Sequence, residues 1–147
     1  MMDDFNEEVE GFLKKYEINS NVGDAEEVVK QFADVFMAAD RGGARAVPSS
    51  VLLMAIPQRR KLFESVESCV TTLASVKQTR LDEGYVLLET EWLVKFDRGS
   101  GRCEDLTLRS TFVVHRSDDG MRIVFYLSHE DLTSVLRKKG VLPPDKT

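Results

Sequence analysis

The sequence predicts an α+β fold in which a long antiparallel β-meander packs against amino-terminal helices. Two observations support this prediction. Apolar residues before about residue 67 recur mainly at helical spacing, whereas from Cys69 onward they recur with the two-residue period of strands. Short turns rich in glycine, aspartate and serine then divide the second half into the runs 69–81, 85–97, 103–116 and 121–128.

Composition restricts the class of protein. Of the 147 residues 42% are hydrophobic and 31% are charged, a profile typical of a globular chain, and we expect residues 1–147 to form one domain. The net charge of −5 disfavours nucleic acid as a partner. Cys69 and Cys103 lack the spacing of metal ligands, so we expect neither a metal site nor a disulfide. We also expect no cofactor.

No segment predicts membrane insertion or export. The longest apolar run, Val51 to Ile56, is far shorter than the roughly 20 residues of a membrane-spanning helix. The amino terminus is acidic and lacks the apolar segment of a secretory signal. We therefore expect a cytoplasmic protein that binds no membrane.

Two amphipathic helices are predicted first. The apolar groups of residues 3–16 form one helical stripe, and the segment 18–23 is expected to end that helix. A second helix is expected to begin at Asp24, with Glu27 completing a capping box, and to end at the glycines of segment 40–43. Its apolar stripe is Val28, Phe32, Val35, Phe36 and Ala39.

A short strand and two further helices complete the predicted elements. The run 51–56 is too short for a buried helix and favours a strand, and Pro57 suits the first position of a helix that extends to Glu67. After the meander, Ser128 is expected to cap a carboxy-terminal helix with Asp131 at its third position. The apolar stripe of that helix is Leu132, Val135 and Leu136.

The turns of the meander fix how its strands pair. Three-residue loops at 82–84 and 99–101 define the register of two hairpins. The opposite-charge pairs that result are Lys77 with Glu89, Glu91 with Arg109, and Lys95 with Asp105. Such pairs contribute about 0.2–1 kcal/mol each, and a shift by one residue would lose all three.

This register sorts the side chains of the meander into two faces. The face expected to lie against the helices carries Val70, Ala74, Val76, Val86, Leu88, Trp92, Val94, Phe96, Leu106, Leu108, Phe112, Val114, Ile123, Phe125 and Leu127. The outer face carries the charge pairs with Tyr85, Leu87, Leu93, Thr111, Val113, His115, Val124 and Tyr126. Because this mixture is too apolar for solvent alone, we expect a homodimer through the outer sheet face.

The order of elements resembles the nuclear transport factor 2-like superfamily, which includes ketosteroid isomerases and polyketide cyclases. Residues 36–43 are similar to the family's helix end and turn, and residues 109–124 are similar to its last hairpin. Met121 stands where the family often has tryptophan, and the carboxy-terminal helix extends the common core. The resemblance implies a curved, cystatin-like sheet wrapped around the helices, a conical cavity between them, and dimers formed through the outer sheet face.

Few polar side chains fall on the face predicted to be buried. They are Thr72, Gln78, Arg80, Thr90 and Ser110. Thr90 and Ser110 are expected to lie opposite each other, with Trp92 one step along, and a mostly apolar pocket with a few polar groups is typical of small-molecule sites. We therefore predict that Trp92, Thr90, Ser110, Gln78 and Arg80 bind a small apolar molecule. The alternative is that both hydroxyls bond locally and Trp92 is part of the core.

Acid–base catalysis requires a carboxylate or histidine directed into such a pocket. The register turns Glu89 and Glu91 outward, and the meander offers no inward carboxylate, so no catalytic residue is predicted. Asp34 and Asp40, on or after the second helix, are expected to face solvent, and the alternative is that one of them reaches the mouth of the cavity. His115 falls on the outer face, and His129, at the start of the last helix, is expected to be solvated or to interact with the helix dipole.

Three functions are compatible with this sequence. The favoured one is a non-catalytic domain that binds a small molecule in the cavity between sheet and helices. The second is an enzyme of the isomerase, cyclase or dehydratase type, which lacks its acid or base in the predicted site. The third is a dimeric protein-interaction module whose cavity is filled by side chains, and the volume of the cavity separates this third function from the other two.

Overall fold

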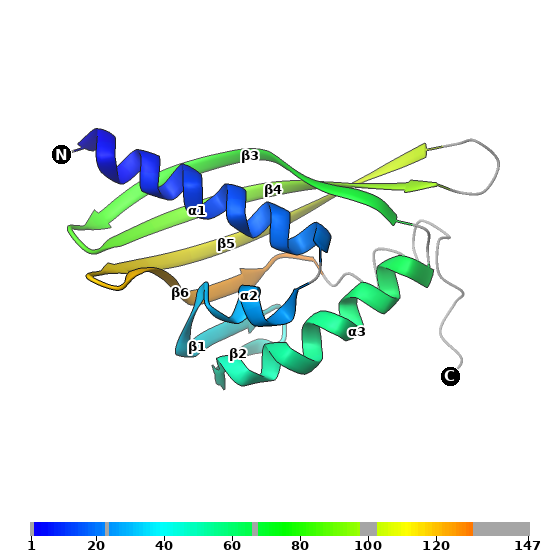
Figure 1. Cartoon of the computed structure of the whole chain (residues 1–147), viewed down its shortest axis with the longest axis horizontal. Coiled ribbons are helices and arrows are strands. Elements are labelled where there is room, and N and C mark those ends of the chain that lie inside the picture. The colour runs from blue at the N-terminus through cyan, green and yellow to red at the C-terminus, as the bar shows by residue number, and fades with distance from the viewer. Residues whose placement is uncertain (1, 23, 66–67, 98–102, 131–147) are drawn as a thin grey trace.

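A computed structural model describes residues 2–22, 24–65, 68–97 and 103–130. The described elements are α1 (Met2–Val22), α2 (Ala25–Val29), β1 (Phe32–Asp40), β2 (Gly43–Pro48), the 3₁₀ turn η1 (Ser49–Val51), α3 (Leu52–Ser65), β3 (Ser68–Asp82), β4 (Tyr85–Asp97), β5 (Cys103–Ser117) and β6 (Gly120–Ser128). The strands form one six-stranded sheet in the order β2-β1-β6-β5-β4-β3, and α1 runs diagonally across its inner face (Figure 1). The α+β class is thus confirmed, with helices against a curved sheet.

The predicted meander is confirmed as four consecutive antiparallel strands, β3 to β6. The register of β4 and β5 agrees with the prediction along its whole length, and it places Glu91 opposite Arg109. Lys77 lies opposite Glu89, as expected. The predicted register is therefore correct at the centre of the sheet. The turn between β3 and β4 differs from the expected loop 82–84, because Asp82 pairs with Tyr85 and a register shift precedes it. The expected loop 99–101 lies outside the described residues.

A β-bulge in β3 moves side chains away from their predicted face. The pairing shifts between Leu73 and Ser75, so that Leu73 lies opposite Trp92 and packs on the core. Ala74 and Thr72, both predicted to face inward, are exposed. A single extra residue reverses the face of every side chain beyond it, and the alternating pattern alone does not locate it. The side chains of Val70 and Phe96 lie outside the described set.

A second bulge has the same effect in β6. The partner of Val113 is Phe125, whereas Val114 pairs with Ile123, so Val124 is the extra residue. Tyr126, predicted on the outer face, therefore packs inward against Phe112 with ring centroids 5.3 Å apart. Phe125 and Leu127, predicted inward, share the outer face with Val113 and Thr111. Ile123 precedes the bulge and is fully buried, as expected.

The prediction of a long second helix is wrong. After α2 the chain forms strand β1, which pairs parallel with β6 and antiparallel with β2, so the sheet is mixed rather than a pure meander. Phe32 and Phe36 are both buried, as their spacing requires. An interval of four residues keeps two side chains on one face of a helix and equally on one face of a strand. The sequence pattern therefore did not separate the two.

The segment after β1 also differs from the prediction. The turn of residues 40–43 closes a β-hairpin, in which the Asp40 carboxylate accepts a bond from the Gly42 N–H (2.7 Å) and Gly43 has a φ of 138°. The expected strand 51–56 is instead helical, in η1 and α3. Pro57 lies inside α3 and cannot donate the usual helical bond to the Leu53 carbonyl. Short apolar runs are ambiguous between strand and buried helix.

The first helix is longer than predicted and covers one edge of the sheet. It continues through Val22, beyond the expected end at Tyr16. Its last turns contact the main chain of β3: Asn21 donates to the Thr71 carbonyl (2.8 Å) and accepts from the Thr71 N–H (2.8 Å). Glu17 accepts a bond from the Leu73 N–H (2.6 Å). These side chains occupy the bonding positions that a neighbouring strand would take.

The core lies between α1, the amino end of β1 and the inner face of the sheet. Its fully buried large side chains are Phe112, Leu88, Ile123, Val9, Val86, Val94 and Val114. None of the described helices has the length and apolarity for a membrane span. The predicted carboxy-terminal helix lies outside the described residues.

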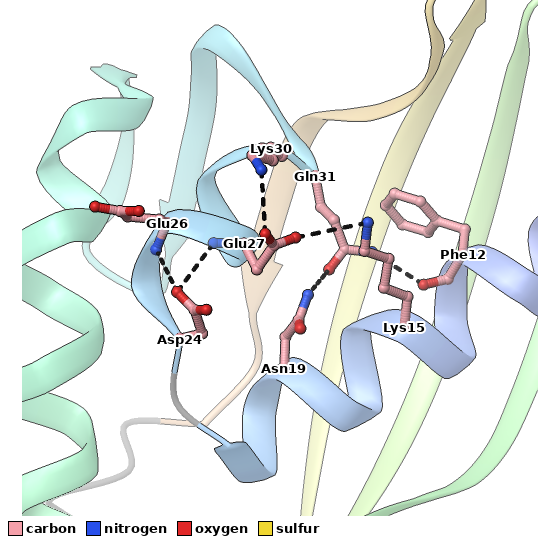
Figure 2. A network of polar contacts seen from close by, with 8 residues as sticks. All are labelled: Phe12, Lys15, Asn19, Asp24, Glu26, Glu27, Lys30 and Gln31. Atoms are coloured by element: carbon pink, nitrogen blue, oxygen red, sulfur yellow. Dashed lines mark hydrogen bonds and ion pairs between the residues drawn. The ribbon is translucent and has the colours of Figure 1, made fainter.

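A polar network at the end of α1 joins the helices to the sheet (Figure 2). The buried Gln31 side chain accepts a bond from Asn19 Nδ2 (3.0 Å) and donates one to the Phe12 carbonyl (3.0 Å). The Gln31 main-chain carbonyl accepts from the Ile123 N–H of β6 (2.8 Å). Next to it, Asp24 caps α2 by accepting bonds from the N–H groups of Glu26 and Glu27 (Figure 2), as predicted for this N-cap.

Replacing Gln31 with leucine is expected to lower the free energy of unfolding by about 1–3 kcal/mol, because the buried Asn19 amide then lacks its acceptor. Urea denaturation measures this loss. In the double variant Asn19→Leu/Gln31→Leu no polar side chain is left unpaired, so its loss should be smaller than the sum of the two single losses. If the loss of the double variant equalled the sum of the two single losses, the Asn19 and Gln31 side chains would not stabilise each other.

Candidate functional site

A pocket of about 180 Å³ lies where α1 crosses the inner face of β4, β5 and β6. Its lining residues are Tyr16 and Ser20 from α1, Thr71 from β3, Trp92 from β4, Leu108, Arg109 and Ser110 from β5, Tyr126 and Ser128 from β6, and Glu130 just after β6. Aromatic rings from three different elements therefore meet hydroxyl groups and a carboxylate at one place.

Three predicted site residues form a buried polar cluster beside this pocket. The Trp92 indole N–H lies 2.8 Å from Thr90 Oγ1 and 3.1 Å from Ser110 Oγ. The Thr90 hydroxyl donates to the Ser110 main-chain carbonyl (2.8 Å), and the two hydroxyl oxygens are 2.9 Å apart. The hydroxyls thus bond locally, as the alternative interpretation stated, while Trp92 and Ser110 also line the pocket. Their role in ligand binding stays a prediction.

The other two predicted site residues lie away from the pocket. Gln78 is half-buried in β3 opposite Leu88. The Arg80 guanidinium lies 4.4 Å from the centroid of the Phe5 ring and bonds to main-chain carbonyls of the β3–β4 turn. Both side chains lie on the same inner face of the sheet as Trp92, but at the end of β3 that is far from the pocket. The structure therefore divides the predicted set into two groups.

The titratable candidates also lie outside the pocket. Asp34 is fully exposed, 4.0 Å from a nitrogen of Arg122. Asp40 bonds within its own hairpin turn. His115 stacks on Tyr85 of the outer face, with ring centroids 4.7 Å apart. In the described part of the chain, no group of three or more histidine, cysteine or acidic side chains is arranged to hold a metal ion.

One carboxylate that the sequence did not suggest does line the pocket. Glu130 accepts a bond from the Arg109 N–H (2.7 Å) through one oxygen and from the Arg109 guanidinium (2.8 Å) through the other. Burial raises the pKa of the Glu130 carboxyl, but the main-chain and side-chain bonds from Arg109, with the charges of Arg109 and His129, outweigh it and lower the pKa overall. Glu130 is therefore an anion at neutral pH.

The chain just after β6 positions this carboxylate. The His129 N–H donates to the Arg109 carbonyl (3.2 Å), and the His129 ring lies 2.7 Å from the Thr111 hydroxyl. The Ser128 hydroxyl donates to the Glu130 carbonyl (2.9 Å). Because β6 stops at Ser128 while β5 continues, residues 129 and 130 bond to the edge of β5 that β6 leaves open. These bonds hold the Glu130 carboxylate against Arg109, and both residues line the pocket.

The residues that line the pocket differ in how far the sequence pattern predicts their position. Tyr16 belongs to the apolar stripe predicted for the first helix, and that stripe predicts that it faces the sheet. Tyr126 was hidden by the bulge at Val124, which reverses its face. Glu130 carried no signal, because nothing in the pattern marks a carboxylate that bonds to the edge of a strand. Chemically, the pocket can pack a small ring or alkyl group against aromatic faces and accept hydrogen bonds from it.

Comparison with known proteins found neither a matching family model nor a matching curated protein. Solved structures with the same architecture do match. A cystatin-like, NTF2-like protein from Novosphingobium aromaticivorans superposes with a TM-score of 0.72 at 16% identity, over 97% of this chain and 92% of that one. An NTF2-like protein of unknown function from Shewanella oneidensis gives 0.66 at 18% identity, over 85% and 98%.

An NTF2-like superfamily protein from Salmonella enterica gives a TM-score of 0.64 at 15% identity, over 90% of this chain and 96% of that one. Identities this low establish the fold and not the activity. The similarity extends over most of each chain, in agreement with the helices, the curved sheet and the order of elements described above. This protein therefore has the cystatin-like fold of the nuclear transport factor 2-like proteins.

Proposed function

We propose that this protein binds a small molecule in the pocket between α1 and the sheet. The observation that supports this most directly is the unfilled volume of about 180 Å³ beside Trp92, Tyr16 and Tyr126. The side chains of the described residues leave this space open, which favours ligand binding over a purely structural interaction module. A comparable cavity of about 150 Å³ in another protein holds benzene.

The volume also limits the size of the ligand. Pockets for drug-sized molecules enclose roughly 300–1,000 Å³. The space beside Trp92 suits a single ring or a short branched chain, with its polar group directed at Ser110, Ser128 or Glu130. A steroid-sized ligand is too large for it.

An enzymatic function has weaker support. A general acid or base works best when its pKa lies near the working pH. The carboxylate in the pocket, Glu130, has a lowered pKa and is held by two bonds from Arg109, so it is a poor base and carries no proton to donate at neutral pH. These features favour binding over proton transfer.

A homodimer through the outer sheet face is a second proposal, and the bulge in β6 supports it. Because the bulge turns Phe125 and Leu127 outward, the outer face is more apolar than the sequence predicted. These side chains lie beside the half-buried Leu87 and Val113. Such a patch is typical of protein–protein contacts.

Ligand binding is testable through the fluorescence of Trp92, the one tryptophan of the chain. We expect phenol to change the emission of Trp92 in a saturable way and to raise the melting temperature. Ser20→Phe adds a ring to the exposed wall of the pocket and should abolish both effects. Lys14→Phe adds the same ring elsewhere on α1 and should leave them unchanged. Unsaturable quenching, or equal loss in both variants, would argue against the pocket.

The ionised state of Glu130 predicts a pH dependence of stability. Since its folded pKa is lowered, its stabilising effect is present above the ordinary value of 4.5 and is lost as the pH falls through the folded pKa. Glu130→Gln should therefore unfold at lower urea concentration than the native chain at pH 7, and the difference should shrink below pH 4.5. A difference that is constant across this range would show that the carboxylate charge is not stabilising.

The dimer proposal predicts that the native chain elutes as a dimer at micromolar concentration. Phe125→Asp places a charge in the apolar part of the outer face and should give a monomer with an unchanged circular dichroism spectrum. Lys14→Asp, at an exposed position of α1 on the opposite side of the sheet, is the control. A native chain that light scattering shows to be monomeric at this concentration would contradict the dimer.

A further inference from the structure

We propose that the pocket recognises a small organic cation, such as a methylated or alkylated ammonium group, between its aromatic walls and the Glu130 carboxylate. This inference rests on the proposed binding function and adds the chemical class of the ligand. It is based on three features of the lining: the arrangement of the rings, the hydrogen bonds of Trp92, and the surroundings of Glu130.

Three aromatic side chains line the pocket: Tyr16, Trp92 and Tyr126. Tyr16 lies 5.6 Å from Trp92 at 45°, centroid to centroid, and 5.3 Å from Phe112. The Tyr126 ring also contacts Phe112, with ring centroids 5.3 Å apart. The rings are tilted and come from α1, β4 and β6, so they border the pocket from different directions. Tyrosine and tryptophan faces attract ammonium groups, and clusters of such faces recognise methylated ammonium ligands.

The indole of Trp92 offers this pocket its ring and not its N–H group. Its Nε1 already lies within hydrogen-bonding distance of the Thr90 and Ser110 hydroxyls. Thr90 is 2% exposed, which keeps this cluster away from water. The one N–H donor of the indole is therefore not available to an anionic or carbonyl ligand. What remains for a ligand is the electron-rich surface of the ring.

Glu130 supplies the counter-charge at the same wall. Its side chain is 17% exposed, whereas the guanidinium side chain of Arg109 that pairs with it is 53% exposed. The positive partner is thus more strongly screened by solvent than the carboxylate. Among the described residues, each Glu130 oxygen accepts one bond, from Arg109, and a carboxylate has about four acceptor sites, which leaves acceptor positions for a ligand N–H or an ammonium group.

The matched test uses choline and 3,3-dimethyl-1-butanol, which have the same shape and differ by a charged nitrogen in place of a carbon. We expect choline to bind at least about tenfold more tightly, as measured by Trp92 fluorescence and by NMR shifts of pocket residues. The preference should decrease at high salt, because part of it is coulombic. Phenol serves as the neutral ring probe in the same titrations.

Two variants locate the cation. Glu130→Gln keeps the shape of the side chain and should reduce the preference for choline over the neutral alcohol, without changing the binding of the alcohol. Tyr126→Leu removes one ring face and should reduce the preference in the same direction. Glu10→Gln, at an exposed position of α1, is the control for a general change of charge and should have no effect.

The outcomes separate this inference from the proposed binding function. If phenol binds and choline binds no more tightly than the alcohol, the cation proposal is wrong and the binding function stands. If none of the three probes binds, both are wrong. A choline preference that survives Glu130→Gln and Tyr126→Leu would place the cation outside this pocket and would also overturn the proposal.

Discussion

The contacts of a single residue, Gln31, join the two layers of this protein. Its side chain bonds to the Phe12 carbonyl and the Asn19 amide of α1, and its main-chain carbonyl accepts the Ile123 N–H of β6. Strand β1 therefore starts at a point already fixed to both the long helix and the last strand, although these elements are far apart in sequence. The parallel pairing of β1 with β6, and with it the position of Tyr126 relative to Tyr16, depends on this junction. A buried amide suits the role because it donates and accepts at once.

The half of the fold that local chemistry determines was predictable. Turn glycines and cross-strand charges set the register of β4 and β5, because any slip would separate opposite charges and bury polar groups. The bulges at Ala74 and Val124 were not predictable, because a bulge is stabilised by tertiary contacts and leaves no local mark in an alternating pattern. The strand β1 was missed for a related reason. Its buried phenylalanines are spaced by four, and the pairing with the partner strands β2 and β6 determines which structure that spacing adopts.

The same division holds for the pocket. Thr90, Ser110 and Trp92 were grouped correctly because they depend only on the register of β4 and β5. Gln78 and Arg80 lie on the same face as these three residues but far from them along the sheet, because the face of a side chain does not determine its distance along the strand. Tyr126 and Glu130 depend on a bulge and on the end of a strand. Fold and register thus predicted the floor of the pocket, whereas its charged and aromatic rim emerged only from the three-dimensional arrangement.

The side chains with which α1 covers the edge of β3 connect the protection of that edge with the integrity of the pocket. Asn21 and Glu17 bond to the main chain of Thr71 and Leu73, and their neighbours Tyr16 and Ser20 form a wall of the pocket. Any chain that pairs with this end of β3 must first displace the last turns of α1, and the same displacement removes a wall of the pocket. For a ligand bound as proposed, release from the pocket and exposure of this sheet edge would require the same movement of α1, so an occupied pocket would also protect the edge against aggregation.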